Sequence, residues 1–196
     1  MKDNITGIIL CGGKSTRMKG KNKAFLEKDG KTFIEIIYEN LTQVTKEVLI
    51  VSNEPETFSN NKFQVFRDII KRNTPLSGIH SGLVNMNTDF GFVLACDMPF
   101  LKKEILGVIA EKADFSSDVV TPWEDSYFQP LCSVYSKKCI PFIETLLLKG
   151  EVKTDKLFKL INLKKIPYDD LRNFDPELKS FININSEKDF KIFLNQ

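Results

Sequence analysis

Near its start the chain reads Ile5-Thr-Gly-Ile-Ile-Leu-Cys-Gly-Gly-Lys-Ser-Thr-Arg-Met-Lys-Gly-Lys-Asn-Lys23, a stretch that changes character halfway along. Residues 8–11 form a short apolar run that indicates a buried strand. The run ends at Gly12-Gly13, where the absence of side chains allows a sharp turn and brings backbone N–H groups close to a ligand. Four lysines and an arginine follow. Backbone donors and cations directly after a buried strand suit a polyphosphate.

Two common phosphate-binding motifs do not fit this loop. Walker A needs a glycine at position 8, which is Ile8, and Gly7 is one residue too early and lies in the strand. The dinucleotide pattern G-x-G-x-x-G fails because Gly12 and Gly13 are adjacent. The loop instead has the form Leu-x-Gly-Gly-x-Ser-x-Arg-Met, which resembles the signature loop of nucleotidyltransferases that hold an NTP. A plain strand–turn–helix junction is the alternative interpretation.

The composition is that of a folded domain without an unusual partner. With 196 residues, 42% hydrophobic and 28% charged, the chain is predicted to form a single domain over residues 1–196. A net charge of +2 gives no reason to expect nucleic acid as a partner. No apolar run reaches the ~18 residues of a membrane span, and no signal peptide is visible. We therefore expect a cytoplasmic protein with no membrane or nucleic-acid partner.

The cysteines and the single histidine disfavour several classes of site. Cys11, Cys96, Cys132 and Cys139 are scattered and form no Cys-x-x-Cys pair, and His80 is the only histidine. A zinc site is therefore disfavoured, and three of the cysteines lie in or at the end of apolar runs, where a cysteine is usually a core residue. One histidine also makes a Cys–His pair or a Ser–His–Asp triad a poor hypothesis.

Apolar runs that indicate strands alternate with segments of helical periodicity over the first two-thirds of the chain. The expected strands cover residues 8–11, 24–26, 48–51, 63–66, 92–96, 119–121, 131–135 and 163–166. The expected helices cover residues 33–44, 79–86, 102–112, 140–149, 154–160 and 186–194. The first helix follows Thr32, whose spacing to Glu35 is that of a capping box. This alternation predicts an α/β fold with a mostly parallel central sheet wrapped by helices.

Polar residues follow the last residues of four expected strands, at Gly12, Asn53, Asp68 and Asp97. Ligands of such sheets bind at the carboxyl ends of the strands, so these four positions predict a nucleotide-sized cleft. Asp97 follows a buried strand and precedes Met98-Pro99, which makes it the best candidate for a Mg²⁺ ligand. Its alternative role is the N-cap of the helix near 102. Asp68 is as well explained by a turn as by a ligand.

Four further segments have both a functional and a purely structural interpretation. Residues 75–79 offer backbone donors for an anion, or only an ordinary helix start. Gln129 is a candidate partner for a planar ligand, or for the backbone. The segment Asn183-Ile-Asn-Ser186 either closes on the site or caps the last helix. The aromatic-rich residues 123–128 either cover a pterin-like ring or merely pack in the core.

Taken together, these segments resemble the MobA family, the molybdenum cofactor guanylyltransferases. The matching stretches are Leu10-Cys-Gly-Gly-Lys-Ser-Thr-Arg-Met18 with Lys23, Asp68 with Thr74-Pro-Leu-Ser-Gly-Ile79, Cys96-Asp-Met-Pro-Phe100, Gln129-Pro-Leu131 with Tyr135, and Asn183-Ile-Asn185. They occur in the family's order and span nearly the entire chain. The combination of the glycine loop, Cys-Asp-Met-Pro and Gln-Pro-Leu is specific, although each motif alone is weak to moderate.

The resemblance implies a Rossmann-like, three-layer nucleotidyltransferase fold that transfers GMP from GTP to molybdopterin and requires Mg²⁺. It implies a molybdenum-insertion protein and molybdoenzyme chaperones as partners. The GTP-binding positions that it implies are Leu10, Cys11, Gly12, Gly13, Lys23, Asn53, Asp68 and Asp97. The catalytic positions that it implies are Arg17, Lys23 and Asp97, with Asp97 also the metal ligand.

This chain departs from the family pattern in three places. It has Cys11 where alanine is usual, Thr74 where glycine is usual, and a basic run up to Lys23 that is one residue longer and has Asn22 for aspartate. The rival hypotheses are a CTP-using enzyme acting on the same pterin, another nucleotidyltransferase for a sugar or polyol phosphate, and a non-catalytic carrier of the pterin.

Overall fold

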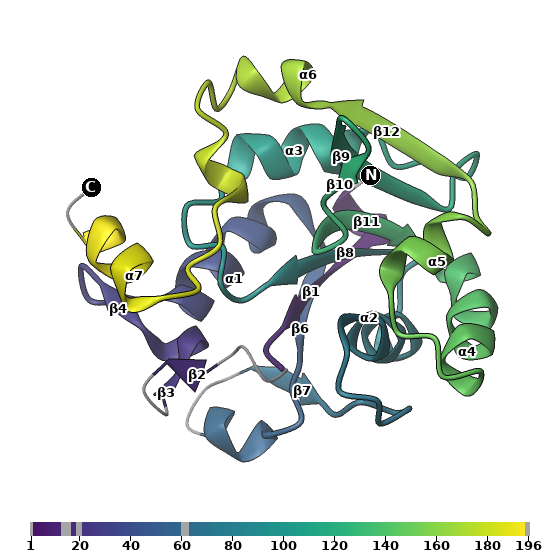
Figure 1. Ribbon diagram of the computed structural model, residues 1–196, viewed down its shortest axis with the longest axis horizontal. Helices are drawn as coiled ribbons and strands as arrows, with labels where there is room; N and C mark the ends of the chain where they lie inside the picture. The colour runs from purple at the N-terminus through teal and green to yellow at the C-terminus, as the bar shows by residue number, and fades with distance from the viewer. Residues whose placement is uncertain (1, 13–16, 19–20, 60–62, 195–196) are drawn as a thin grey trace.

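The computed structural model describes residues 2–12, 17–18, 21–59 and 63–194 (Figure 1). Its main sheet has eight strands in the order β10-β9-β11-β8-β1-β6-β7, with β12 also paired to β9. The strands are β1 (Ile5–Leu10), β6 (Glu47–Val51), β7 (Gln64–Phe66), β8 (Phe90–Ala95), β9 (Val119–Glu124), β10 (Tyr127–Phe128), β11 (Cys132–Ser136) and β12 (Leu163–Pro167). The helices are α1 (Phe33–Val44), α2 (Pro75–Asn85), α3 (Lys103–Glu111), α4 (Ile140–Leu148), α5 (Thr154–Phe158), α6 (Tyr168–Arg172) and α7 (Glu187–Leu194).

The sheet is mostly parallel, as the alternation of strands and helices predicts. Strand β1 pairs in parallel with both β6 and β8, and β6 pairs in parallel with β7. Strand β11 runs antiparallel to β8 and β9, whereas β12 is parallel to β9. The carboxyl ends of β7, β6, β1 and β8 therefore lie side by side at one edge of the sheet.

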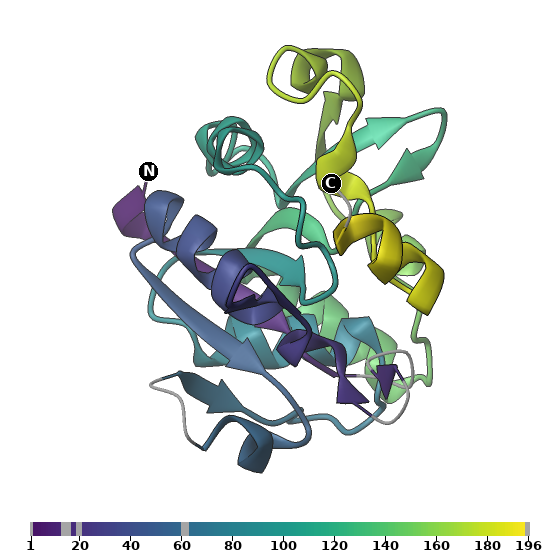
Figure 2. The ribbon, with the colours of Figure 1, turned by 90° about the vertical axis from the view of Figure 1, so that its left-hand side faces the viewer.

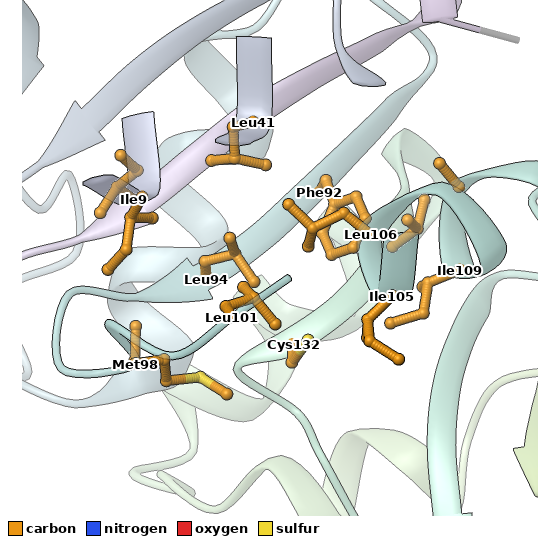
Figure 3. Close-up of a cluster of buried hydrophobic side chains, with 14 of the residues drawn as sticks. Ile9, Leu41, Phe92, Leu94, Met98, Leu101, Ile105, Leu106, Ile109 and Cys132 are labelled. Atoms are coloured by element: carbon orange, nitrogen blue, oxygen red, sulfur yellow. The ribbon is translucent and has the colours of Figure 1, made fainter. Parts of the chain in front are cut away.

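Helices cover both faces of the sheet, which gives three layers (Figures 1 and 2). Helices α1 and α3 pack on the face that receives Ile9, Phe92 and Leu94, and Figure 3 shows these side chains meeting Leu41 and Ile105. Successive residues of a strand point to opposite faces. The intervening residues of β1 and β8 therefore pack against α2 and α4. Because both faces are buried, β1 is a continuous apolar run without alternation.

Helix α2 packs closely against β1 and begins at a defined N-cap. A Cβ atom at Gly82 would lie 2.5 Å from Cγ2 of Ile8, so only a glycine lets α2 approach β1 this closely. The helix starts at Pro75, and the hydroxyl of Thr74 accepts a hydrogen bond from the backbone N–H of Ser77. This arrangement places the first turn of α2 at the carboxyl edge of the sheet.

The last part of the chain returns to the first. Helix α7 packs against the start of α1, where the rings of Phe33 and Phe193 meet edge to face with centroids 5.1 Å apart (Figures 1 and 2). The capping box predicted for α1 is present, with Thr32 and Glu35 each accepting a hydrogen bond from the other's backbone N–H. Within the described residues, no helix combines the length and the apolar character needed to cross a membrane.

One predicted strand is wrong. Residues 24–26 were expected to be extended, but Lys23–Phe25 form a 3-10 helix. The side chain of Asn22 accepts a hydrogen bond from the N–H of Ala24, 3.0 Å away, and this local cap outweighs the apolar character of the run. Several short elements were not predicted, because they carry no periodic signal. They are the five-residue helix α6 and the two-residue strands β10, β2 (Arg17–Met18), β3 (Lys21–Asn22), β4 (Glu27–Lys28) and β5 (Lys31–Thr32).

Candidate active site

A cavity of about 360 Å³ opens at the carboxyl edge of the sheet. It is lined by the residues that follow four parallel strands, together with the start of α2, Leu131 and Asn183. The predicted site residues that line it are Leu10, Gly12, Asn53, Asp68 and Asp97. The four polar positions expected at this edge from the sequence are therefore brought together. Gly13 lies outside the described residues, and for Arg17 only the backbone is described, in strand β2 (Arg17–Met18).

Backbone hydrogen bonds extend the sheet beyond the last residue of β1. The N–H of Cys11 donates to the carbonyl of Val51 at 2.8 Å, and the N–H of Cys96 donates to the carbonyl of Leu10 at 3.2 Å. Cys11 is 2% exposed, and burial together with the neighbouring Cys96 raises the pKa of its thiol well above the usual range. Cys11 is therefore a core residue that can reach a ligand only through its backbone.

Gly12 forms an open part of the cavity wall. It is exposed, and a Cβ atom added to it would meet nothing within 4 Å. The backbone at this position is consequently accessible to a ligand from the cavity. This is the geometry expected of a glycine whose backbone approaches a phosphate closely.

Asp97 is held in place from two sides. Its carbonyl accepts a hydrogen bond from the N–H of Ile184 at 2.9 Å, and its Oδ2 lies 3.8 Å from Nζ of Lys23. Burial raises the pKa of this carboxyl, and the charge of Lys23 opposes that shift. Helix α3 is preceded by Lys102 at its N-cap, so the alternative interpretation of Asp97 as the cap of that helix is wrong.

The second oxygen of Asp97 suits a cation. Oδ1 is buried and has no hydrogen-bond partner in the described part of the chain. A buried carboxylate oxygen without a partner is costly unless a ligand satisfies it. Mg²⁺ is usually held by one or two carboxylates and by substrate phosphates. Among the described residues, no group of three or more His, Cys, Asp or Glu could hold a metal.

Asp68 and Asn53 form a small hydrogen-bonded cluster on the opposite wall. Nδ2 of Asn53 donates to Oδ2 of Asp68 at 2.9 Å and to Oδ1 of Asn73 at 3.0 Å, and the N–H of Asp68 donates back to Oδ1 of Asn53 at 3.2 Å. Asp68 is 7% exposed. Burial raises the pKa of its carboxyl, while Asn53 and the nearby His80 oppose the shift. The cluster offers fixed polar groups to a ligand in the cavity.

Lys23 is the buried cation of the site, with a side chain 2% exposed. Its Nζ donates a hydrogen bond to Oδ1 of Asn185 at 2.9 Å. The loop Asn183–Asn185 thus closes on the site, and Ser186 also caps α7 by accepting from the N–H of Asp189. Both interpretations of this segment hold, although the sequence alone favoured only the cap.

Two further segments have a structural role. Residues 75–79 are the first turns of α2, although Pro75 and Gly78 also line the cavity. Nε2 of Gln129 donates to the hydroxyl of Tyr168 at 2.7 Å, so a side chain holds this amide group. The contribution of Asn73 was missed, and Asn185 was predicted only as part of a segment that closes on the site or caps the last helix. The family motif at 183–185 was the only sequence signal that pointed to Asn185.

The chain is similar to known proteins in both sequence and fold. Residues 7–165 match the MobA-like NTP transferase domain. The chain is 35% identical to the molybdenum cofactor guanylyltransferase of Desulfosudis oleivorans, over 96% of this chain and 94% of that protein. It also superposes on the crystal structure of the molybdopterin-guanine dinucleotide biosynthesis protein A from Archaeoglobus fulgidus, with a TM-score of 0.83, 29% identity and 97% of each chain covered.

The sheet, the glycine turn and the acidic residue at its edge define an enzyme of the nucleotidyltransferase class. More particularly, the chain belongs to the MobA-like NTP transferase family, the family of the molybdenum cofactor guanylyltransferases.

Proposed function

We propose that the chain transfers GMP from GTP to the terminal phosphate of molybdopterin, forming molybdopterin guanine dinucleotide and pyrophosphate. The observation that carries this proposal is that the open backbone of Gly12 and the carboxylate of Asp97 line one cavity, with the buried ammonium group of Lys23 3.8 Å from that carboxylate. These are the three kinds of group that a metal-bound triphosphate needs. The names of the full-length relatives favour GTP and molybdopterin as the substrates.

The nucleotide would occupy the first cavity with its phosphates at the glycine turn. Backbone N–H groups of Gly12 and Gly13 would donate to phosphate oxygens, and Lys23 would supply positive charge. Leu10 and Cys11 would contribute backbone and shape, since both are buried. Asn53 and Asp68, fixed by their mutual hydrogen bonds, would bind the nucleoside end of GTP.

Asp97 would hold the magnesium ion through the oxygen that lacks a partner. A bound Mg²⁺ supplies charge neutralisation and polarises phosphate oxygens. Burial raises the pKa of Asp97, and Lys23, close to the other oxygen of the same carboxylate, opposes that shift and so favours the ionised form. Oδ1 of Asp97 is then the oxygen that the ion would contact.

The chemical step needs positioning more than proton transfer. An oxygen of the molybdopterin phosphate attacks the α-phosphorus of GTP in line, a new P–O bond forms, and the bond to the β-phosphate oxygen breaks. The attacking phosphate is already ionised, so no general base is required. The electron pair and negative charge leave with pyrophosphate, and Arg17 and Lys23 would neutralise that charge. The dinucleotide would then pass to a molybdenum-insertion protein or a molybdoenzyme chaperone.

A pyrophosphate-release assay tests the proposal directly. The protein is incubated with molybdopterin, Mg²⁺ and each of GTP, CTP, UTP and ATP in turn, and thermal shifts are measured with the same nucleotides. Of the four nucleotides, we expect only GTP to give pyrophosphate release. We expect no release when molybdopterin or Mg²⁺ is omitted. Release with CTP in place of GTP, or tight binding of the pterin without any release, would contradict the proposal.

A further inference from the structure

The structure has a second cavity, of about 580 Å³, with a lining residue that is a sequence neighbour of one lining the first. Leu131 lines the first cavity and Pro130 lines the second, so one peptide bond joins their walls. Residues of the hairpin β9–β10, helix α5 and strand β12 line it. Figure 1 shows β9, β10 and β12 on the side of β11 that faces away from β8. The mechanism above makes no use of this cavity.

Aromatic rings form one wall of the second cavity. The rings of Phe128 and Phe158 meet edge to face, with centroids 5.3 Å apart and planes at 79°. Tyr135 lies beside Phe158, and its hydroxyl donates to the carbonyl of Pro130 at 2.8 Å, which fixes the wall shared by the two cavities. Tyr127, 63% exposed, adds a ring that is open to solvent. Such a wall suits a planar ring system.

Two ammonium groups lie at the same cavity without a carboxylate partner. Nζ of Lys165 is held 4.9 Å from the ring centroid of Trp123 and 5.5 Å from that of Phe128. In the part of the chain that the structure describes, neither Lys165 nor Lys159 forms a salt bridge with a carboxylate, in contrast to the neighbouring Lys164. Positive charge beside aromatic rings favours a ligand that is both planar and anionic.

The turn of the hairpin holds this wall in a strained conformation. Asp125 and Ser126 have φ values of 45° and 71°, the two positive values of a turn that normally takes Asn-Gly. A serine in this region is disfavoured, and strain of this kind gathers at sites that bind ligands. The two-residue turn is what places Tyr127 and Phe128 beside the cavity.

We propose that the second cavity holds the pterin ring of the acceptor, an inference that rests on the function proposed above. The ring lies against Phe128 and Tyr127, and Lys159 and Lys165 pair with the anionic dithiolene end of molybdopterin. Asp155, which also lines the cavity, accepts from the N–H groups of the pterin. The terminal phosphate passes Pro130 and enters the first cavity, where the α-phosphorus of GTP lies.

Binding of molybdopterin itself, measured in the absence of GTP, tests this placement without catalysis. Trp123 is the only tryptophan, and quenching of its fluorescence reports binding. The variants are Lys159→Glu and Lys165→Glu, and the matched control is Lys156→Glu, an exposed lysine of α5 that does not line the cavity. We expect each of the first two to weaken pterin binding about tenfold. The control should bind like the unaltered protein, and GTP thermal shifts should be the same in all four.

The outcomes separate this inference from the proposed function. Equal pterin affinity in all four proteins, or equal weakening in the control, would overturn the placement. GMP transfer with an unchanged KM for molybdopterin in the Lys159 and Lys165 variants would overturn the placement and leave the function standing. Pterin binding that depends on Lys165 in a protein that transfers no GMP would overturn the function and leave the placement standing.

Discussion

Nζ of Lys23 lies 2.9 Å from Oδ1 of Asn185, a residue 162 positions further along the chain. The residue before it, Ile184, donates its N–H to the carbonyl of Asp97. One loop near the end of the chain therefore fixes both the cation and the carboxylate of the site. The packing of α7 against the start of α1 holds that loop in place.

Asn185→Ala should impair catalysis by releasing Lys23. The ammonium group is buried and would lose its hydrogen-bond partner, which costs about 1–3 kcal/mol. We expect kcat/KM to fall at least about tenfold. The free energy of unfolding should fall by about 1–3 kcal/mol. Steady-state kinetics and urea unfolding measure the two effects. Asn173→Ala, at an exposed asparagine that follows α6, is the control and should change neither. Unchanged kinetics in Asn185→Ala would show that Lys23 needs no positioning.

Asp97→Asn should separate activity from stability. The amide keeps the size of the side chain but removes the charge that would hold Mg²⁺, so we expect turnover to fall at least about a hundredfold. Burial disfavours the charged form of Asp97, so the substrate-free variant should unfold at the same or a higher temperature at neutral pH. Asp170→Asn, at an exposed aspartate of α6, serves as control. Pyrophosphate release near the unaltered rate in Asp97→Asn would rule out the metal role.

The strands and their polar ends were predictable because buried parallel strands are continuous apolar runs. The run before Gly12 and the run before Asp97 both end where the sheet ends. The contact of Lys23 with Asn185 was not predictable, because no spacing rule joins residues so far apart. The error at residues 24–26 came from the cap by Asn22, a single hydrogen bond that outweighed the apolar pattern. The assignment of residues 1–196 to one domain stays a prediction.

The pH dependence of activity should reflect the raised pKa of Asp97. Its carboxyl must be ionised to hold a cation, and burial raises its pKa above that of an ordinary aspartate, about 3.9. Activity should therefore be lost as pH falls through this raised value. In the substrate-free protein, the folded state binds this proton more tightly than the unfolded state. The stability that this proton contributes is fully present below the pKa that Asp97 has in the unfolded state. It is lost as pH rises through the pKa that Asp97 has in the folded state.

Unfolding temperatures measured against pH test that dependence. As pH rises between the two pKa values of Asp97, the unfolding temperature of the substrate-free protein should fall. In Asp97→Asn, this fall of the unfolding temperature with pH should be absent. Mg²⁺ with GTP should restore stability above the folded pKa, since binding favours the folded state. Identical profiles for the unaltered protein and Asp97→Asn would show that Asp97 titrates normally.

Two glycine-to-alanine substitutions should give opposite results. At Gly12 a methyl group meets nothing within 4 Å, so the free energy of unfolding should change by less than about 0.5 kcal/mol. The methyl group would nevertheless stand where phosphates approach the backbone, and GTP affinity should fall about tenfold or more. At Gly82 a Cβ atom would lie 2.5 Å from Cγ2 of Ile8, so Gly82→Ala should destabilise the fold by about 1–3 kcal/mol. Urea unfolding and GTP titration separate the two effects. Undiminished GTP binding by a folded Gly12→Ala protein would contradict the placement of the triphosphate at this turn.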